Sequence, residues 1–208
     1  MTRPTTVLFD LGGVLIRWNP RNLYRKIFDG DEAGMERFLS TICTPLWNLE
    51  QDQGRSLAEG TRVLVERHPE HRELIESYYG RWEEMLDGAI EENVALLRRI
   101  VDAGHPVYAI TDWSAETFPI ARRKFDFLGL FKGIVVSGEE GCLKPSARIF
   151  GVLDRRYGLA PADMTFIDDS RENVDGAAEL GFDTVHYTDP EHLREAMSER
   201  GYLDVRAR

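Results

Sequence analysis

Polar residues follow short apolar runs at several points of this 208-residue chain. Asp10 ends VLFD, Thr111 ends YAIT, Lys144 lies in CLKP, and Asp168 and Asp169 end FIDD. In open sheets of parallel strands, ligands collect beyond the carboxyl ends of the strands. We therefore expect these five side chains to lie near one another at one edge of a sheet.

Each of these residues also has an ordinary structural interpretation when taken alone. Asp10 could be a turn residue, Thr111 a hydroxyl bonded to the backbone, and Lys144 a solvated loop lysine. The Asp168-Asp169 pair could cap the following helix. Together they favour phosphoryl transfer, which needs a nucleophile, a divalent cation, hydrogen-bond donors and a compensating positive charge.

The three aspartates also predict a metal cofactor. Mg²⁺ prefers oxygen ligands and keeps several waters, so Asp10, Asp168 and Asp169 with one backbone carbonyl would make a suitable set of ligands. Without a cation, three adjacent carboxylates would repel one another and raise their pKa values. The sequence therefore predicts bound Mg²⁺.

The elements that position these residues alternate between strand-like and helix-like segments. Strands are expected near residues 7–9, 107–110, 134–136, 165–167 and 184–187. Ser114, Ser146 and Asp189-Pro190 are predicted helix starts, and Gly181 is a predicted helix end. This order is typical of an α/β fold with a Rossmann-like, doubly wound parallel sheet.

The alternation stops between residues 19 and 88, where only helical patterns occur. Helix starts are expected at Asn19-Pro20 and Asp31, and Ser56 begins a capping-box pattern. About four helices fit this segment. We predict a core formed by residues 1–18 and 89–208, with residues 19–88 inserted as an α-helical cap over the strand ends.

Composition narrows the possible partners. A net charge of −10 disfavours nucleic acid and other polyanions. No apolar run reaches 18 residues, and charge appears too early for a signal peptide, so we expect a cytoplasmic protein without membrane contact. Cys43 and Cys142 lack the spacing of a disulfide framework or a zinc site. We expect a monomer or homodimer that acts on a small phosphorylated molecule.

The motifs DLGGVL, TD, KP and DDxxxN, in this order, resemble those of the haloacid dehalogenase superfamily along the whole chain. The helical insertion is similar to the C1 cap of that superfamily. The segments DLGGVLIRWNPRNLYRKIF and YAITDWSAETFPIARRKF resemble a bacterial phosphatase-like branch, which looks related to sugar-phosphate phosphatases that begin FDLGNV. The resemblance implies a Mg²⁺-dependent phosphatase of a small phosphomonoester, with a sugar phosphate as the expected substrate.

The resemblance also implies a role for each motif residue. Asp10 would attack phosphorus and become an aspartyl-phosphate. The backbone carbonyl of Gly12 would coordinate Mg²⁺ alongside Asp10 and Asp168, with Asp169 binding directly or through a water.

The same resemblance implies the residues that face the phosphate. Thr111 would donate to a phosphate oxygen, and Lys144 would hold the nucleophile and the phosphate together. The remaining substrate-binding residues would be Gly13, Asp112, Trp113 and Asn173, the last as a supporting residue.

Two departures from the superfamily pattern concern proton transfer. Most of its phosphatases carry a second Asp two residues after the nucleophile, as the acid that protonates the leaving group, but this chain has Gly12. A general acid is worth roughly 100 to 10,000-fold in rate. Asp112 stands where Asn is more common. We hypothesise that Asp112 either points out of the site or replaces the missing acid.

Two other functions remain open on the sequence alone. A 2-haloacid dehalogenase uses the same nucleophile without metal, although such enzymes resemble this chain less at Gly12, Asp168 and Asp169. A binding protein that has lost catalysis would agree with the two departures. Haloacid turnover without metal would indicate the first, and ligand binding without turnover the second.

The cap is expected to choose the substrate. Trp47 and Trp82 are expected to pack in the core, and Trp113 against the cap, rather than to bind a ligand. The candidate pocket residues of the cap are Trp18, Asn19, Trp47, Arg55, Arg81 and Trp82.

Overall fold

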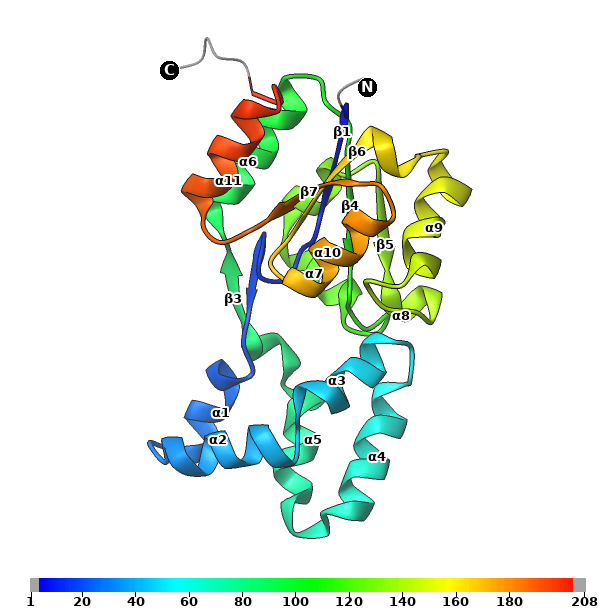
Figure 1. The fold of residues 1–208 in the computed structure, drawn as a ribbon. Coiled ribbons are helices and arrows are strands. Elements are labelled where there is room, and N and C mark those ends of the chain that lie inside the picture. The colour runs from blue at the N-terminus through cyan, green and yellow to red at the C-terminus, as the bar shows by residue number, and fades with distance from the viewer. Residues whose placement is uncertain (1–3, 204–208) are drawn as a thin grey trace.

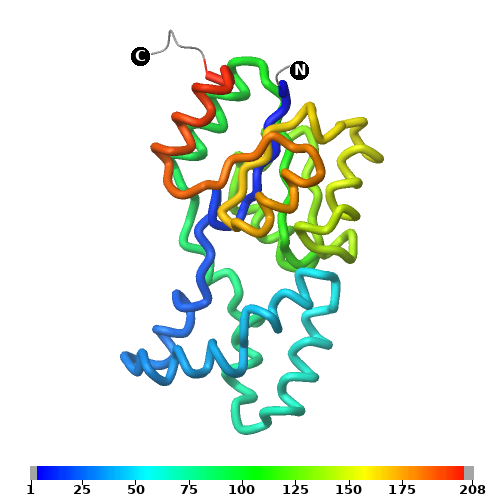
Figure 2. Tube along the Cα trace, viewed as in Figure 1, coloured from blue at the N-terminus to red at the C-terminus, as the bar shows by residue number. Residues whose placement is uncertain are grey.

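The computed structural model describes residues 4–203, which form two parts joined by a narrow ribbon (Figure 1). The ribbon consists of two antiparallel strands, β2 (Ile16–Trp18) and β3 (Leu86–Ala89). One part holds a five-stranded sheet and the other is built of helices. Figure 2 shows the chain leaving the sheet part in blue and returning to it in green.

The larger sheet has the order β5-β4-β1-β6-β7, and every neighbouring pair is parallel. Its strands are β1 (Thr6–Phe9), β4 (Val107–Thr111), β5 (Gly133–Val136), β6 (Met164–Asp168) and β7 (Asp183–His186). Each overlaps a strand predicted from an apolar run. These strands read as continuous apolar runs because both faces of the sheet are covered.

Side chains of β1 alternate between two hydrophobic clusters, one on each face of the sheet. Val7 and Phe9 pack with residues of α6 (Glu91–Asp102), α7 (Phe118–Lys124) and α11 (Pro190–Glu199). Leu8 packs with residues of α9 (Ala147–Tyr157) and α10 (Arg171–Glu179). Helices therefore cover both faces, and the predicted doubly wound α/β fold is confirmed.

Capping residues lie at several of the predicted helix boundaries. The side chains of Ser146 and Asp189 accept hydrogen bonds from backbone N–H groups at the starts of α9 and α11, as predicted. Gly181 has a φ of 94° just beyond α10, in agreement with a predicted helix end. The predicted helix start at Ser114 is wrong, because α7 begins at Phe118 and the Ser114 hydroxyl instead accepts from Glu116 N–H in a turn.

The helical part contains more helices than the sequence suggested. They are α1 (Arg21–Phe28), α2 (Glu32–Thr41), α3 (Pro45–Asp52), α4 (Leu57–Arg67) and α5 (Arg72–Gly80), with 3₁₀ turns η1 (Pro69–His71) and η2 (Trp82–Met85). Asp31 and Ser56 cap α2 and α4 as expected. Tyr24, Phe38, Trp47 and Tyr78 pack ring against ring at its centre.

The helical part contacts the sheet part at the end of α3. The Ser137 hydroxyl, at the start of α8 (Ser137–Glu140), donates to the Asp52 carbonyl. The N–H of Leu57 donates to Glu116 at 2.8 Å. A Cβ on Gly54 would lie 3.2 Å from the Gly138 carbonyl, so the backbones approach closely here. The two parts therefore meet beneath the ends of β4 and β5.

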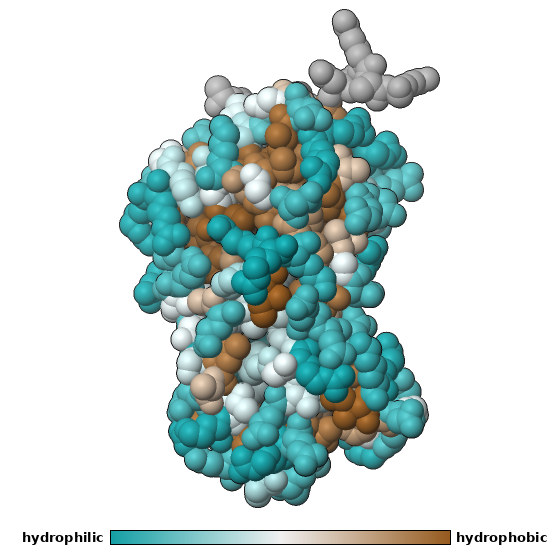
Figure 3. Space-filling model, turned by 180° about the vertical axis from the view of Figure 1, so that it is seen from behind, coloured by the Kyte–Doolittle hydropathy of each residue, from teal (hydrophilic) through white to brown (hydrophobic). Residues whose placement is uncertain are grey.

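The surface is mainly hydrophilic. Figure 3, seen from behind, shows teal over most of both parts, with hydrophobic residues visible in separate patches. Among residues 4–203, no helix has the length and hydropathy needed to cross a membrane.

The sheet part also contains two 3₁₀ turns, η3 (Asp126–Leu130) and η4 (Pro161–Asp163).

A buried asparagine fixes the loop that follows β1. The Asn93 side chain is fully buried in α6, and its amide donates to the Val14 carbonyl at 2.6 Å. A buried carbonyl that loses its donor is costly. This bond therefore holds the segment that carries Asp10 to Val14 against the sheet part.

We expect Asn93→Ala to lower the free energy of unfolding by about 1 to 3 kcal/mol, because it leaves the Val14 carbonyl buried without this partner. Urea denaturation measures the change. Glu92→Ala, at the exposed neighbouring position, is the control and should leave stability nearly unchanged. Equal stability of the two variants would contradict this role of Asn93.

Candidate active site

The candidate site lies where the connections of the sheet diverge. The strand β1 has β4 on one side and β6 on the other, and the chain crosses from β1 to β4 and later returns to β6. Such a switch point leaves a crevice at the carboxyl ends of the strands. Asp10 follows β1, Thr111 ends β4 and Asp168 ends β6. The topology thus brings together residues that are far apart in the chain.

A carboxylate cluster forms at this crevice. Oxygen atoms of Asp10, Asp168 and Asp169 lie within 4.8 Å of one another. Lys144 Nζ lies 2.9 Å from Asp10 Oδ1 and 2.7 Å from Asp168 Oδ2, so it bridges two of the three carboxylates. The Lys144 side chain is only 2% exposed. Four of the five residues predicted to converge therefore lie in this cluster. The fifth, Thr111, is buried at the end of the neighbouring strand β4.

The cluster changes the acidity of its members. Burial raises the pKa of Asp10 above its usual value; Lys144 opposes this rise, whereas Asp168 and Asp169 add to it. Burial and the charge of Asp168 also raise the pKa of Asp169. Burial alone would lower the pKa of Lys144, but the surrounding carboxylates reverse this and raise it. Lys144 thus stays positively charged while the carboxylates lack sufficient positive charge.

Asp168 is held in place by donors from several elements. The N–H of Ser170 donates to its Oδ1 at 2.8 Å, and the Asn173 amide lies 3.2 Å from both carboxylate oxygens. The structure thus places the Asn173 amide against the Asp168 carboxylate. Ser170 rather than Asp168 or Asp169 caps α10 through its side chain.

The two glycines after the nucleophile have different environments. Gly13 has a φ of 76°, and a Cβ there would lie 2.2 Å from Asp169 Oδ2, so this position needs glycine. The Gly13 N–H donates to the Ile16 carbonyl at 3.0 Å and is therefore not free to bind a ligand. The missing side chain of Gly13 instead leaves space for the Asp169 carboxylate. A Cβ on Gly12 would meet nothing within 4 Å.

A pocket of about 100 Å³ opens beside Gly12. Asp112 and Trp113 line it from the loop after β4, while Trp18 and Trp82 line it from the ribbon and η2. The Trp113 indole N–H donates to Thr117, and its ring packs against that of Trp82, so both tryptophans are fixed in place. Asp112 faces the pocket, and its Oδ1 accepts from the backbone N–H of Lys144 at 3.1 Å.

Sequence reasoning missed three pocket residues from the helical part, namely Asn48, Asp52 and Tyr79. Burial and the nearby charge of Asp112 raise the pKa of Asp52 to about 7, against the opposing effect of a hydrogen bond from the Ser114 backbone. Helical periodicity gives no indication of which helix end will face another part of the chain. Only the packing of the two parts places Asp52 at the site.

Some predicted cap residues lie away from the pocket. Arg81 is paired with Glu84 on the surface, and Arg55 is paired with Glu50 and Gln51. The Trp47 indole donates to the Gly60 carbonyl inside the helical part, in agreement with a packing role. Trp18, together with Asn19, borders a larger adjoining cavity of about 570 Å³ between the ribbon and α1 to α3.

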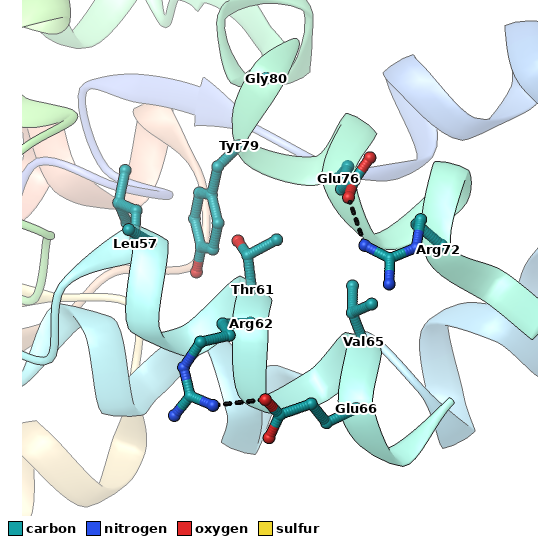
Figure 4. Close-up of a pocket in the computed structure, with 10 residues that line it drawn as sticks. Leu57, Thr61, Arg62, Val65, Glu66, Arg72, Glu76, Tyr79 and Gly80 are labelled. Carbon is teal, nitrogen blue, oxygen red and sulfur yellow. Dashed lines mark hydrogen bonds and ion pairs between the residues drawn. The ribbon is translucent and has the colours of Figure 1, made fainter. Parts of the chain in front are cut away.

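Another hollow, of about 480 Å³, lies between α4 and α5 (Figure 4). Its charged side chains pair with each other, Arg62 with Glu66 and Arg72 with Glu76. It holds none of the residues of the carboxylate cluster. This hollow is therefore distinct from the carboxylate cluster, and Tyr79 lies between it and the pocket beside Gly12.

Comparison with known proteins identifies the family. A model described as haloacid dehalogenase-like hydrolase matches residues 4–181. The chain belongs to this family. A sesquiterpene phosphatase of Aspergillus oryzae is 26% identical to this hydrolase over 191 residues, which cover 88% of this chain and 89% of the relative. A drimenol cyclase of Aspergillus calidoustus is 23% identical over 92% of this chain and 35% of that protein.

Solved structures share the fold of this hydrolase. A haloacid dehalogenase family enzyme of Bacteroides thetaiotaomicron, solved with magnesium and inorganic phosphate, is 23% identical with a TM-score of 0.68 and covers 91% of this chain and 98% of its own. The L-2-haloacid dehalogenase of Xanthobacter autotrophicus, with chloropropionic acid covalently bound, is 12% identical with a TM-score of 0.63, covering 99% and 91%. At these identities the likeness concerns the fold alone.

We expect Gly13→Ala to destabilise the hydrolase by about 1 to 2 kcal/mol, because an L side chain is unfavourable at this positive φ. The added methyl group would also displace the Asp169 carboxylate. Gly12→Ala is the matched control, since its Cβ meets open space. Urea unfolding of both variants tests this difference, and a loss of stability in Gly12→Ala that equals the loss in Gly13→Ala would contradict it.

Proposed function

We propose that this hydrolase is a Mg²⁺-dependent phosphatase that hydrolyses a small phosphomonoester through an aspartyl-phosphate on Asp10. The observation that carries the proposal is the buried arrangement in which Lys144 bridges Asp10 and Asp168 beside Asp169. A buried charged cluster of this kind costs stability, so its presence points to a function rather than to a structural role. Its position at the switch point of the sheet supports a ligand-binding role.

The donor set suits Mg²⁺. Asp10, Asp168 and Asp169 offer carboxylate oxygens within 4.8 Å, and hard oxygen ligands are those that Mg²⁺ prefers. The raised pKa values of Asp10 and Asp169 indicate that the cluster has less positive charge than it needs. We infer that these three carboxylates and the Gly12 carbonyl hold the ion, which supplies positive charge to the carboxylates and to the phosphate when bound.

Each residue of the site then has its own role in the reaction. A carboxylate oxygen of Asp10 attacks phosphorus, and the bond from phosphorus to the leaving oxygen breaks. The Lys144 ammonium lies against Asp10 and balances negative charge on the transferring group, while the Thr111 hydroxyl donates to a phosphate oxygen. Asn173 keeps Asp168 oriented toward Lys144. Water then hydrolyses the aspartyl-phosphate and restores Asp10.

Residues 19–88 act as a cap in this proposal. Asn48, Asp52 and Tyr79 from the helical part line the pocket beside Gly12, together with three tryptophans. Aromatic rings with nearby hydrogen-bonding groups suit a small organic leaving group. A sugar phosphate is the class implied by the sequence resemblance, and the Aspergillus oryzae relative adds a sesquiterpenyl phosphate as a second class to test.

The carboxylate cluster favours a phosphatase over a 2-haloacid dehalogenase. A dehalogenase would attack carbon with Asp10 and would have no use for the additional charges of Asp168 and Asp169. A binding protein without catalysis would likewise have little reason to keep Lys144 buried among carboxylates. Release of halide from 2-haloacids without metal would support the dehalogenase instead.

We expect wild-type protein to release inorganic phosphate from p-nitrophenyl phosphate, sugar phosphates or a sesquiterpenyl phosphate only when Mg²⁺ is present. Asp10→Asn should lower this rate by at least about 1,000-fold, because the amide cannot serve as the nucleophile. Asp163→Asn, which changes an exposed Asp just before the other end of β6, is the control and should retain activity.

The same experiment can contradict the proposal in two ways. Release that continues with chelator would exclude the role of Mg²⁺, and release that survives in Asp10→Asn would exclude the nucleophile. If no phosphate compound is hydrolysed, a 2-haloacid assay decides between a dehalogenase and a binding protein.

A further inference from the structure

The site lacks a side-chain proton donor at position 12, two residues after the nucleophile. Gly12 has no side chain, and a Cβ placed there would meet nothing within 4 Å. An alkoxide leaving group needs a proton as it departs, and a general acid must be within reach of it. Two carboxyl groups, those of Asp52 and Asp112, line the pocket that Gly12 leaves open. Either could occupy the place of the missing acid.

Asp52 is fixed in this pocket by contacts on both sides. Its Oδ2 accepts from the Asn48 amide at 2.7 Å, and the Asn48 oxygen accepts from the Tyr79 hydroxyl at 3.0 Å. This chain of hydrogen bonds sets the orientation of the carboxyl group within the helical part. The backbone carbonyl of Asp52 accepts from Ser137, whose hydroxyl oxygen also accepts from the Trp113 N–H at 2.9 Å. Asp52 is thus attached to the same loop that carries Asp112.

The two carboxyl groups differ in their nearest charges. Asp112 accepts a hydrogen bond from the backbone N–H of Lys144, and the Lys144 ammonium opposes the effect of burial on its pKa. Among residues 4–203, no Lys or Arg side chain forms an ion pair with Asp52. Burial and the charge of Asp112 raise the pKa of Asp52 to about 7, and only a hydrogen bond from the Ser114 backbone opposes this rise. Of two neighbouring carboxyls in unlike environments, the one without a cation keeps the proton.

We propose that Asp52, from the helical part, is the general acid that protonates the leaving group in place of the missing side chain at position 12. This inference rests on the proposed phosphatase function. As Asp10 bonds to phosphorus, the bond to the leaving oxygen breaks and the Asp52 carboxyl proton passes to that oxygen, which leaves as an alcohol. Asp52 then takes a proton from the water that attacks the aspartyl-phosphate. Phosphate is released, and the Asp10 carboxylate and the protonated Asp52 carboxyl are restored. Protons therefore balance over the cycle.

The decisive experiment varies the leaving group while its shape stays nearly constant. A series of substituted phenyl phosphates, from unsubstituted phenyl to p-nitrophenyl, is assayed with Mg²⁺ for wild type, Asp52→Asn and Asp112→Asn. Without an acid, kcat/KM should fall more for poor leaving groups than for good ones. We expect Asp52→Asn to lose at least about 100-fold on phenyl phosphate but less than about 5-fold on p-nitrophenyl phosphate. Glu50→Gln, exposed on the same helix, should match wild type for every substrate.

The p-nitrophenyl rate in the same sample shows that Asp52→Asn is folded. Equal losses on all members of the series would overturn the acid role and indicate a binding or positioning role instead. A strong dependence on the leaving group in Asp112→Asn, with none in Asp52→Asn, would assign the acid to Asp112. Failure of the phosphatase proposal is distinguishable, because wild type would then release no phosphate from any member, and the acid role would fall with it.

A second measurement does not depend on turnover. Because the folded-state pKa of Asp52 lies above its usual value of 3.8, its ionisation should lower stability as pH rises from about 4 to about 7. Asp52→Asn should therefore gain stability relative to wild type between pH 4 and pH 8. Asp112, Tyr78 and Tyr79 are the titratable groups that interact with Asp52, and they are unchanged in the variant. A stability difference that is the same at both pH values would show that Asp52 is already ionised and would overturn its role as proton donor.

Discussion

Repulsion among Asp10, Asp168 and Asp169 is the strongest constraint on the sheet edge. These carboxylates approach within 4.8 Å of one another, and two of them are buried. Buried charges of one sign are tolerated only where opposite charge and hydrogen-bond donors compensate them. Lys144 supplies the charge, and the Ser170 N–H and the Asn173 amide supply donors to Asp168. The absence of a side chain at Gly13 leaves the space that the Asp169 carboxylate occupies. The buried charges lower stability, and together these features leave three carboxylates placed to hold a cation.

The sequence predicted the fold and most of this edge because both depend on local patterns. A parallel strand buried on two faces reads as an apolar run, so the residue after it lies at the carboxyl end of the sheet. For that reason Asp10, Thr111 and Asp168 could be placed at one edge from the pattern of residues alone. The error at Ser114 has a local cause as well, since a serine before an apolar stretch can bond to a turn as readily as to a helix. Here its hydroxyl accepts from Glu116, and the helix begins four residues later.

Asp52 could not be predicted in the same way. Its place depends on how the helical part sits against the sheet part, which is decided by contacts between distant segments. The Ser137 hydroxyl and the Glu116 carboxylate bind backbone groups on either side of the turn after α3. The close approach of Gly54 to Gly138 lets that turn lie against α8. None of these residues stands out by type or spacing in the sequence. The carboxylate cluster was therefore predictable, whereas the part of the pocket that the helical part contributes was not.

Placement of the acid in the helical part has a consequence for the reaction. If Asp52 gives the proton, both halves of the cycle require the helical part to rest on the sheet part, because Asp52 must first donate and then accept. Separation of the two parts about β2 and β3 would withdraw the acid from Gly12 and leave Asp10 and Lys144 in place. The nucleophile alone would then react only with phosphates whose leaving groups depart without a proton. Substrate contacts that stabilise the joined arrangement would in this way favour cleavage of poor leaving groups. The choice of substrate would then be coupled to proton supply through the end of α3.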